Sequence, residues 1–572
     1  MPGSTPEVPA AARAARRQGG LGAALTLGAA FVALSLLWNL PVTWSGFGWQ
    51  WLASAALEVV VLLALLALAA PLRAGRPGRV VAVLAALATT FVAVSKVAEL
   101  AMRESLARPF NPMFDLPLAR SLVDLLPETL GAVPGWLSIA GLALLPLLVF
   151  ALAWVAVHAA QKALGRRAVR HATLAASALL LGLFAVQQMA PRALGPHRLV
   201  SDHGSVTLYR QWRLARDVQA SLASFQAAVA EDPFRTVPAD RLLAGLGGAD
   251  VLLMFIESYG RSALEQPRYA KIVQPALEAF EEQLAEKGLF AASGWLTSPT
   301  VGGQSWLAHG TLESGLWTPD QAHYDALVRS ERLTLTRAFA RAGYRTVAIK
   351  PAITRPWPEG ERLGFSRIYA AADLGYGGKP YNWVTMPDQY TLAALERAER
   401  AGAAEPLFAE VSLISSHAPW TPIAPVLEDW GAIGDGSVFS RWADAGDPPE
   451  VVWREPERVR AQYVRAIDYV LRVLASYAAN FVDGRTLLLL VGDHQPAPLV
   501  TGEGALHDVP MHVIAGDPEL LAPFEAWGFA PGMRPPAGDP ARPMDAFRDF
   551  FLDAFTPPPD AAVASPGPGP PQ

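Results

Sequence analysis

The sequence contains no cysteine among its 572 residues. This absence excludes a disulfide framework and any thiolate metal site, and it leaves the redox compartment undetermined. Charged side chains are also scarce, at 17%, and the net charge is only −5. Nucleic-acid-binding proteins normally carry a basic patch or stripe, so this balance argues against a nucleic-acid partner.

Apolar residues, by contrast, make up 52% of the chain, which is high for a purely soluble protein. Five apolar runs in the first third reach roughly the 20 residues that a membrane-spanning helix needs. A cleavable signal peptide would have a shorter apolar core and would not precede four further runs. The runs are Leu21–Trp44, Phe47–Leu72, Val80–Met102, Val133–Ala160 and Ala172–Ala190. They predict a cytoplasmic tail over residues 1–20 and a five-helix transmembrane domain over 21–191.

Basic residues in the short connecting segments predict the orientation of these helices. They cluster before the first run, between the second and third, and between the fourth and fifth, and all three segments share one side if all five runs span. The residues are Arg13, Arg16, Arg17, Arg73, Arg76, Arg79, Lys162, Arg166, Arg167 and Arg170. Positive loops stay in the cytoplasm, so an odd number of spans leads to a periplasmic or extracytoplasmic C-terminal domain on a bacterial inner (plasma) membrane.

The rest of the chain has the pattern of an α/β domain. Residues 192–246 are polar and predict a juxtamembrane linker, and residues 557–572 are a low-complexity tail expected to be disordered. Between them, over 247–556, buried strands alternate with helices, which predicts a mostly parallel sheet. The expected strands are 250–256, 344–349, 407–414, 485–491 and 512–515, and the expected helices include 274–287, 333–342 and 457–479.

Chemically active side chains follow four of these strands. Ligands of open α/β sheets bind beyond the carboxyl ends of the strands, where Glu257, Lys350, His417, Asp493 and His494 occur. Carboxylate and imidazole ligands suit one divalent metal, zinc or manganese. Taken alone, Glu257 is better explained as a surface or helix-capping residue. Asp493 and His494 directly follow a buried strand and a glycine, which favours the metal site.

A glycine turn precedes another candidate, Ser305. The turn Gly302-Gly303-Gln304 leads into a predicted helix at Ser305, where backbone N–H groups favour an anion. A hydroxyl bound to a metal becomes a competent nucleophile. Two alternatives stay open at this point: Ser305 as an N-cap residue, and Thr300 as the nucleophile.

Four motifs together resemble the alkaline-phosphatase superfamily, and more narrowly its membrane-anchored, sulfatase-domain lipoteichoic acid synthases and phosphoglycerol transferases. The motifs are FIESYGR, GGQSW, FAEVSLISSHAPW and LLLLVGDHQP, in this order. The resemblance implies that Glu257, Ser305, Asp493 and His494 bind the catalytic metal. It also implies that His417 contacts the transferred phosphate group.

The sequence departs from this family where the head group is held. Lys350 stands where the synthases have a histidine, and Trp357 is retained, but Glu359 replaces an arginine. Arg355 and Arg362 are candidate substitutes for that arginine. His507 matches a histidine that some relatives use near a second metal or the leaving group, which adds it to Lys350, Trp357, Arg355 and His417 as candidate substrate-binding residues.

The resemblance implies a phosphotransferase that moves a phospholipid-derived head group, phosphoglycerol first, onto an exported glycan or lipid through a phospho-serine. A phosphoethanolamine transferase is an alternative, although such relatives usually carry disulfides. A phosphodiesterase or phosphatase on the same scaffold and a non-catalytic membrane sensor are further alternatives. A true sulfatase is disfavoured, because Trp-Leu-Ala-His follows Ser305 instead of x-Pro-x-Arg.

Overall fold

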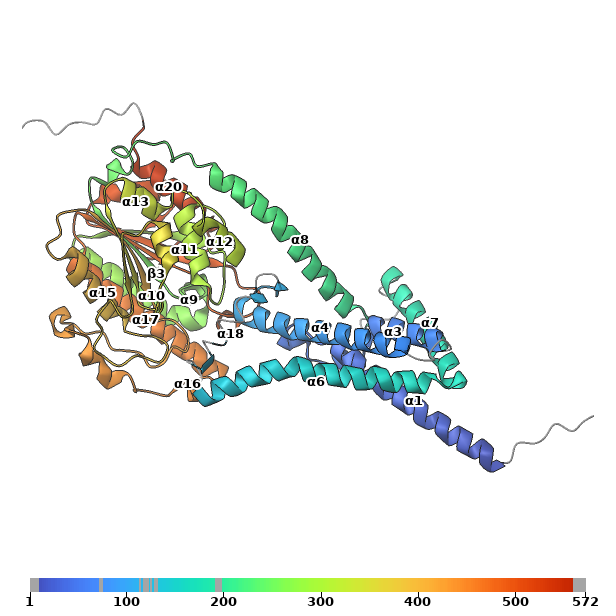
Figure 1. The fold of residues 1–572 in the computed structure, drawn as a ribbon. Helices are drawn as coiled ribbons and strands as arrows, with labels where there is room; N and C mark the ends of the chain where they lie inside the picture. The colour runs from blue at the N-terminus through green and yellow to red at the C-terminus, as the bar shows by residue number, and fades with distance from the viewer. Residues whose placement is uncertain are drawn as a thin grey trace, which may run out of the picture. The chain divides into compact units, whose positions relative to one another are not determined.

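The computed structural model describes residues 10–70, 76–112, 115–116, 123, 126–127, 132–190 and 198–558 (Figure 1). Residues 1–9 of the predicted cytoplasmic tail and 559–572 of the predicted C-terminal tail lie outside this range. The chain divides into two compact units, one of residues 1–104 with 108–218 and one of 105–107 with 219–572. We call them the helical unit and the catalytic unit.

The helical unit contains four helices with stretches long and apolar enough to cross a membrane, counted over the described residues. These stretches are Gly20–Trp38, Gly78–Leu106, Val133–Leu164 and Arg167–Met189. They belong to helices α1 (Ala10–Trp38), α4 (Arg76–Leu106), α6 (Ala132–Leu164) and α7 (Arg167–Met189). Four of the five predicted spans therefore correspond to helices of sufficient length.

The second predicted span is not confirmed as one continuous helix. Its residues form α2 (Trp49–Ala53), the short strand β1 (Ala55–Ala56) and α3 (Leu57–Ala69). The 13 residues of α3 rise about 20 Å, less than the roughly 30 Å of a hydrocarbon core. The helix is interrupted because the backbone of β1 pairs with β2 (Val200–Ser201). Sequence composition does not reveal this long-range contact.

Small side chains line the contacts between helices in this unit, and large apolar ones face outward. The buried cluster is rich in alanine, including Ala30, Ala86 and Ala153. On α6, Leu137 is 68% exposed and Leu148 67% exposed. Helices that pack closely in lipid have small residues at the contacts between helices and large apolar residues such as leucine on the outward face.

The catalytic unit is built on a nine-stranded sheet in the order β10-β4-β9-β8-β3-β7-β5-β6, with β11 beside β4. The strands are β3 (Asp250–Ile256), β4 (Phe290–Thr297), β5 (Arg345–Lys350), β6 (Arg367–Ala370), β7 (Leu407–Leu413), β8 (Thr486–Gly492), β9 (Asp508–Ala515), β10 (Ala530–Pro531) and β11 (Arg542–Pro543). The run β8-β3-β7-β5-β6 is entirely parallel, while β9 is antiparallel to both β8 and β4. The predicted mostly parallel sheet is confirmed.

Alternate residues of the central strand enter two different cores. Leu252 and Met254 pack into one cluster with α10 (Pro267–Glu286) and α17 (Pro456–Phe481). Leu253 and Phe255 pack into the other with α11 (Ser305–Ser314), α13 (Leu335–Arg341) and α20 (Ala546–Phe555). Figure 1 shows these two sets of helices on opposite faces of the sheet. Both faces are covered, which is why β3 is apolar throughout.

Some boundaries differ from the prediction. β9 begins at Asp508, four residues before the predicted strand, and β4 was not predicted at all, because FAASGWLT has few β-branched residues. β5 extends to Lys350, so Lys350 is the last residue of the strand and does not follow it. Helices α10 and α17 both begin earlier than their periodicity indicated.

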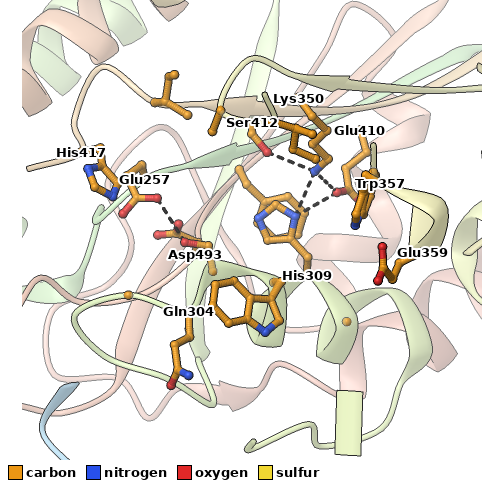
Figure 2. Close-up of a pocket in the computed structure, with 18 of the residues that line it drawn as sticks. Glu257, Gln304, His309, Lys350, Trp357, Glu359, Glu410, Ser412, His417 and Asp493 are labelled. Atoms are coloured by element: carbon orange, nitrogen blue, oxygen red, sulfur yellow. Dashed lines mark hydrogen bonds and ion pairs between the residues drawn. The ribbon is translucent and has the colours of Figure 1, made fainter. Parts of the chain in front are cut away.

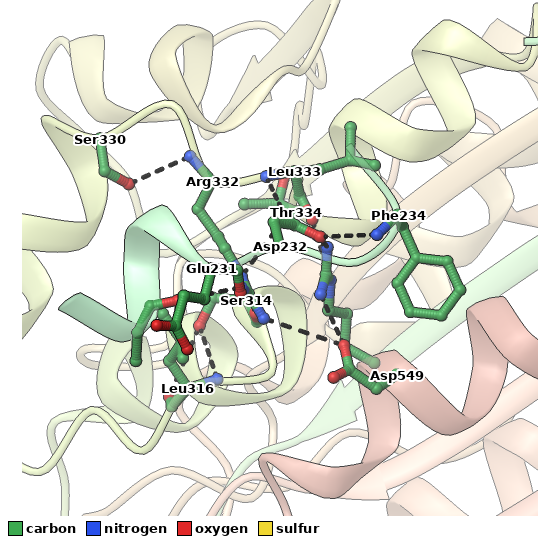
Figure 3. A network of polar contacts seen from close by, with 12 residues as sticks. Glu231, Asp232, Phe234, Ser314, Leu316, Ser330, Arg332, Leu333, Thr334 and Asp549 are labelled. Atoms are coloured by element: carbon green, nitrogen blue, oxygen red, sulfur yellow. Dashed lines mark hydrogen bonds and ion pairs between the residues drawn. The ribbon is translucent and has the colours of Figure 1, made fainter. Parts of the chain in front are cut away.

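A buried ion network joins three chain segments of the catalytic unit (Figure 3). Arg548 of α20 is fully buried and donates to both carboxylate oxygens of Asp232 at 2.7 Å. Arg332 lies 3.6 Å from the same carboxylate. Although burial opposes ionisation, the hydrogen bond and charge of Arg548 lower the pKa of Asp232 below its ordinary value. The segment that follows α8 (His203–Ala230) is thereby held against the α/β core.

Candidate active site

The metal-ligand candidates meet because two neighbouring strands end together. β3 and β8 are parallel, and Ile256 is aligned with Gly492, so Glu257 and Asp493 emerge at the same edge. The ligand atoms of Glu257, Asp493 and His494 all lie within 4.8 Å of one another. In the described part of the chain, this is the group of three acidic or histidine residues whose geometry suits a metal ion.

Ser305 joins this group from the first turn of α11. Its Oγ donates a hydrogen bond to Oε2 of Glu257 at 3.1 Å and lies 3.3 Å from Nε2 of His494. The turn requires left-handed backbone, with φ of 74° at Gly302 and 63° at Gln304. Gln304, and not Ser305, occupies the N-cap position, so the capping interpretation of Ser305 does not match the geometry.

The rival hydroxyl, Thr300, is turned away from the group. Its Oγ1 donates to the carbonyl of Gly303 at 2.7 Å, and the residue is buried. That bond closes the turn that presents Ser305. Between the two hydroxyls, Ser305 is the one beside the candidate metal ligands.

Hydrogen bonds around the ligands orient them. Nδ1 of His494 lies 2.8 Å from the carbonyl of Gln495, so Nδ1 carries the proton and Nε2 keeps its lone pair for a ligand bond. Asp493 accepts from the backbone N–H of Ser258 at 2.8 Å, and Ser416 donates to the carbonyl of Glu257 at 2.6 Å. The sequence did not predict the roles of Ser258 and Ser416 in orienting the ligands, because only their positions next to motif residues pointed to them.

The electrostatics of the group favour a bound cation. Burial and the charge of Glu257 raise the pKa of Asp493 to about 8. Burial lowers the pKa of His494, but the charges of Asp493 and Glu257 outweigh it and raise that pKa to about 9. Burial likewise opposes ionisation of Glu257, yet the charge of His494 lowers its pKa below the ordinary value. Two buried carboxylates, an imidazole lone pair and a hydroxyl fit one divalent metal.

A cavity of about 480 Å³ adjoins this group in the catalytic unit (Figure 2). Its lining includes Glu257, Ser305, Asp493, His417, Lys350, Trp357 and Glu359. His417 stacks on Trp383 with ring centroids 3.8 Å apart, and its Nδ1 is hydrogen-bonded to the carbonyl of Ala418. The second nitrogen of His417 is therefore the one left for a ligand.

Lys350 lines the cavity, but a neighbouring carboxylate neutralises its positive charge. It forms a buried ion pair with Glu410, and its Nζ lies 3.0 Å from Oγ of Ser412 and 3.1 Å from Nδ1 of His309. His309 stacks on Phe255 at 3.7 Å and also lines the cavity. Burial, with the charge of Lys350, lowers the pKa of His309 to about 4, so this ring is neutral at pH 7.

Two buried acids of this network escaped sequence reasoning. Glu410 sits inside the strand LFAEVSL, and a charged residue within an otherwise apolar strand was the available signal. Glu313, on α11, accepts from the backbone N–H of Thr336 at 2.9 Å. Burial and the charge of Glu410 raise the pKa of Glu313 well above its ordinary value.

Two other candidates are not brought to the cavity. Arg355 is exposed and does not line it. The carbonyl of His507 accepts a hydrogen bond from Ser298 at 3.0 Å, and its side chain is absent from the lining. Arg362 is also absent from the lining residues. The arginine that the resemblance led us to expect has no counterpart among the described residues of the cavity wall.

Comparison with known protein families gives a match over less than half of the chain. Residues 249–512 match the model of the sulfatase family. This region is a sulfatase-family domain. The matched region contains β3, α11, β7 and β8, and with them all four motifs. The sulfatase-type domain predicted from those motifs is confirmed, whereas a match to this family does not assign a sulfate ester as substrate.

Solved structures with a similar domain include enzymes of several kinds. The lipoteichoic acid synthase LtaP from Listeria monocytogenes is 12% identical, with a TM-score of 0.34, and the match covers 58% of this chain and 81% of that one. The phosphoglycerol transferase GacH from Streptococcus pyogenes is 13% identical, with a TM-score of 0.32, over 52% and 74%. The phosphonate monoester hydrolase of Agrobacterium radiobacter is 14% identical, with a TM-score of 0.33, over 54% and 73%. At these values the likeness assigns no activity. No curated protein matches the chain.

Proposed function

We propose that the protein is a metal-dependent transferase that moves a phosphorylated head group from a membrane phospholipid to an exported glycan or lipid acceptor. The observation that carries this proposal is the position of Ser305. Its hydroxyl lies within hydrogen-bonding distance of Glu257 and His494, at the wall of a cavity of about 480 Å³. The proposed nucleophile and the candidate metal ligands therefore lie together at a cavity that can hold a substrate.

Four side chains would hold the metal: Glu257, Asp493, His494 and the hydroxyl of Ser305. Zinc and manganese both suit this set of oxygen and imidazole donors. When bound, a divalent ion stabilises the alkoxide of a serine and the charge that develops on a phosphoryl group. The protein contributes the turn at Gly302 and Gly303, which places Oγ of Ser305 at the start of α11 and among the ligands.

The transfer has two steps whose atoms balance. In the first, a bond forms between Oγ of Ser305 and phosphorus, and the bond from phosphorus to the diacylglycerol oxygen breaks. Overall, the proton of the Ser305 hydroxyl is transferred to the oxygen of the departing diacylglycerol. In the second, the oxygen of an acceptor hydroxyl forms a bond to phosphorus and the bond between Oγ of Ser305 and phosphorus breaks; overall, the acceptor's proton is transferred to Oγ of Ser305. His417 lines the same cavity as Ser305 and lies next to Glu257 in Figure 2, and in this proposal it contacts the phosphate.

Membrane anchoring suits this reaction, because the lipid donor is confined to the bilayer surface. We propose a transmembrane domain over 21–191, a juxtamembrane linker over 192–246 and an extracytoplasmic catalytic domain over 247–556, on a bacterial inner membrane. Four spans would leave the N-terminus and the catalytic unit on one side, whereas a fifth span through α3 would separate them. A reporter enzyme fused after Ser201 should be active only outside the cytoplasm, and cytoplasmic activity would overturn the proposed orientation.

The proposal is tested by trapping the intermediate. The full-length protein, loaded with zinc or manganese, is incubated with phospholipids labelled in the head-group phosphate, quenched in acid and digested. We expect label on the peptide that contains Ser305 and release of diacylglycerol. Label on Thr300, or diacylglycerol release without any labelled peptide, would contradict the phospho-serine mechanism. Release of free head group in place of a glycan or lipid product would show a hydrolase.

A further inference from the structure

The wall of the cavity away from the metal-ligand group has its own chemical character. It carries the rings of Trp306, Tyr324 and Trp357 together with the carboxyl groups of Glu313 and Glu359. Figure 2 shows Trp357 and Glu359 on one side of the pocket, with His417, Glu257 and Asp493 on the other. A head group whose phosphate meets Ser305 would extend towards this wall, which we call the distal wall.

The distal wall has an uncompensated negative charge. The carboxylate of Glu359 has no hydrogen bond or ion pair with the described residues, and its charge acts on the neighbouring hydroxyl of Tyr324. Apart from histidines, Lys350 is the basic side chain among the described residues of the lining, and its ammonium is paired with Glu410. The charge of Glu359 is therefore left for a ligand.

The neighbouring groups suit the same kind of ligand. The carboxyl group of Glu313 is buried, and it is hydrogen-bonded both to Thr336 and to Glu410. Tyr324 offers an aromatic face, whose negative quadrupole attracts a cation, while the ring of Trp357 already has Nζ of Lys350 at 5.9 Å from its centroid. An ammonium group placed here gains attraction from both the carboxylate of Glu359 and the rings. The hydroxyls of a glycerol unit can donate hydrogen bonds to that carboxylate but bring no positive charge to neutralise it, and a second anion would be repelled.

We propose that the distal wall is a subsite for an ammonium group, so that the transferred head group is a phosphorylated amino alcohol. This inference rests on the proposed function for the identity of the donor, a zwitterionic phospholipid. The binding preference itself depends only on Glu359 and the aromatic rings. Among the two head groups that the sequence left open, the distal wall favours phosphoethanolamine over phosphoglycerol.

The subsite is tested by binding, independently of turnover. The probes are O-phosphoethanolamine and sn-glycerol-1-phosphate, titrated calorimetrically into the zinc-loaded full-length Ser305→Ala protein, in which neither probe can be turned over. We expect about a 10-fold preference for O-phosphoethanolamine, from one ion pair and the aromatic contacts. Glu359→Gln should reduce that preference to about 2-fold.

The matched control is Glu361→Gln, which removes a carboxylate from the same helix, α14 (Pro358–Leu363), at an exposed position outside the lining. It should leave the preference unchanged. Equal binding of the two probes, tighter binding of glycerol phosphate, or equal effects of the two substitutions would overturn the inference.

Turnover separates this inference from the proposed function. In vesicles of a zwitterionic ethanolamine phospholipid, the active protein should release diacylglycerol faster than in vesicles of phosphatidylglycerol. A binding preference that depends on Glu359, without diacylglycerol release from either vesicle, would overturn the proposed transfer and leave the ammonium subsite standing. Faster release from phosphatidylglycerol would overturn the subsite and leave the transfer standing.

Discussion

The two ends of the cavity each contain a buried cluster of charged groups, but the charges are balanced differently. At one end, Glu257 and Asp493 face a single imidazole, and burial with mutual repulsion raises the pKa of Asp493 to about 8. At the other, Lys350 pairs with Glu410, the neighbouring His309 is neutral at pH 7, and burial with the charge of Glu410 raises the pKa of Glu313 well above its ordinary value.

This difference separates a ligand site from a structural one. The metal-end cluster carries excess negative charge once Asp493 and His494 are deprotonated, and it then gains stability when a cation binds. The cluster of Lys350 and Glu410 already holds its charges as a pair, so it gains nothing from a cation and loses stability when one partner is removed. Substitutions at the metal end should therefore affect catalysis first, and substitutions at the Lys350 end should affect folding first.

The largest expected effect is that of Ser305→Ala. Turnover should fall by about 10³-fold or more, because the hydroxyl of Ser305 lies within hydrogen-bonding distance of both Glu257 and His494, whereas the neighbouring hydroxyl of Ser258 is bonded to Glu257 alone. The free energy of unfolding should change by less than about 1 kcal/mol, since Ser305 does not cap α11. Diacylglycerol release and chemical denaturation measure the two effects.

Ser305→Thr is the companion variant, and it should retain measurable turnover because a hydroxyl remains at the turn. Unchanged turnover in Ser305→Ala would remove the nucleophile from our mechanism while leaving the metal site in place.

Asp493→Asn should have the next largest effect. Loss of a direct ligand should reduce the amount of bound metal. It should also lower turnover by more than the roughly 10–100-fold expected when a residue that only hydrogen-bonds to a ligand is changed. Metal content by mass spectrometry of the purified protein is the measurement. Ser416→Ala, which removes only a bond to the backbone of Glu257, is the matched control and should keep its metal. Full metal occupancy in Asp493→Asn would show that the ligand set is wrongly assigned.

At the Lys350 end, stability should respond. Lys350→Met or Glu410→Gln alone should cost about 3–5 kcal/mol, because each leaves an unpaired buried charge, and the double variant should cost less than the sum. The control is the exposed pair Lys379 and Asp444, whose side chains are 62% and 80% accessible. Its removal should cost at most about 1 kcal/mol. Equal costs for the two pairs would contradict the contrast between buried and exposed charge.

The smallest expected effect is a pH dependence of metal stabilisation. Burial and carboxylate charges hold the metal-free pKa values of Asp493 near 8 and His494 near 9, against ordinary values of 3.8 and 6.5. Between pH 6.5 and 8 the folded metal-free protein keeps protons that the unfolded chain has released. Its free energy of unfolding should therefore fall by about 1–3 kcal/mol as the pH rises through this window.

Metal binding removes this decline, because the ligands bind the ion in their deprotonated forms. The rise in Tm on adding zinc to chelator-treated protein should be larger at pH 8 than at pH 6.5. Asp493→Asn should show little rise at either pH. An equal rise in wild-type protein at both pH values would contradict the charge imbalance assigned to the metal end.

The sequence alone determined which edge of the sheet carries the candidate site residues. Buried strands such as DVLLMFI and TLLLLVG can belong only to a sheet covered on both faces, and parallel strands bring their carboxyl ends to one edge. Glu257, Asp493 and His494 were therefore predictable as neighbours before any distance was known. Ser305 was predictable from its glycine turn, although the choice over Thr300 needed the hydrogen bond that turns Thr300 away.

Only the tertiary structure decided the features that depend on partners distant in sequence. Strand β1 interrupts the second apolar run because Val200 and Ser201, far along the chain, pair with it. The ammonium of Lys350 is paired with Glu410, which the sequence did not reveal, because the parallel register of β5 and β7 places these two residues beside each other. A residue's own sequence neighbourhood sets its strand or helix, but its charge state and availability are set by the groups that the fold packs against it.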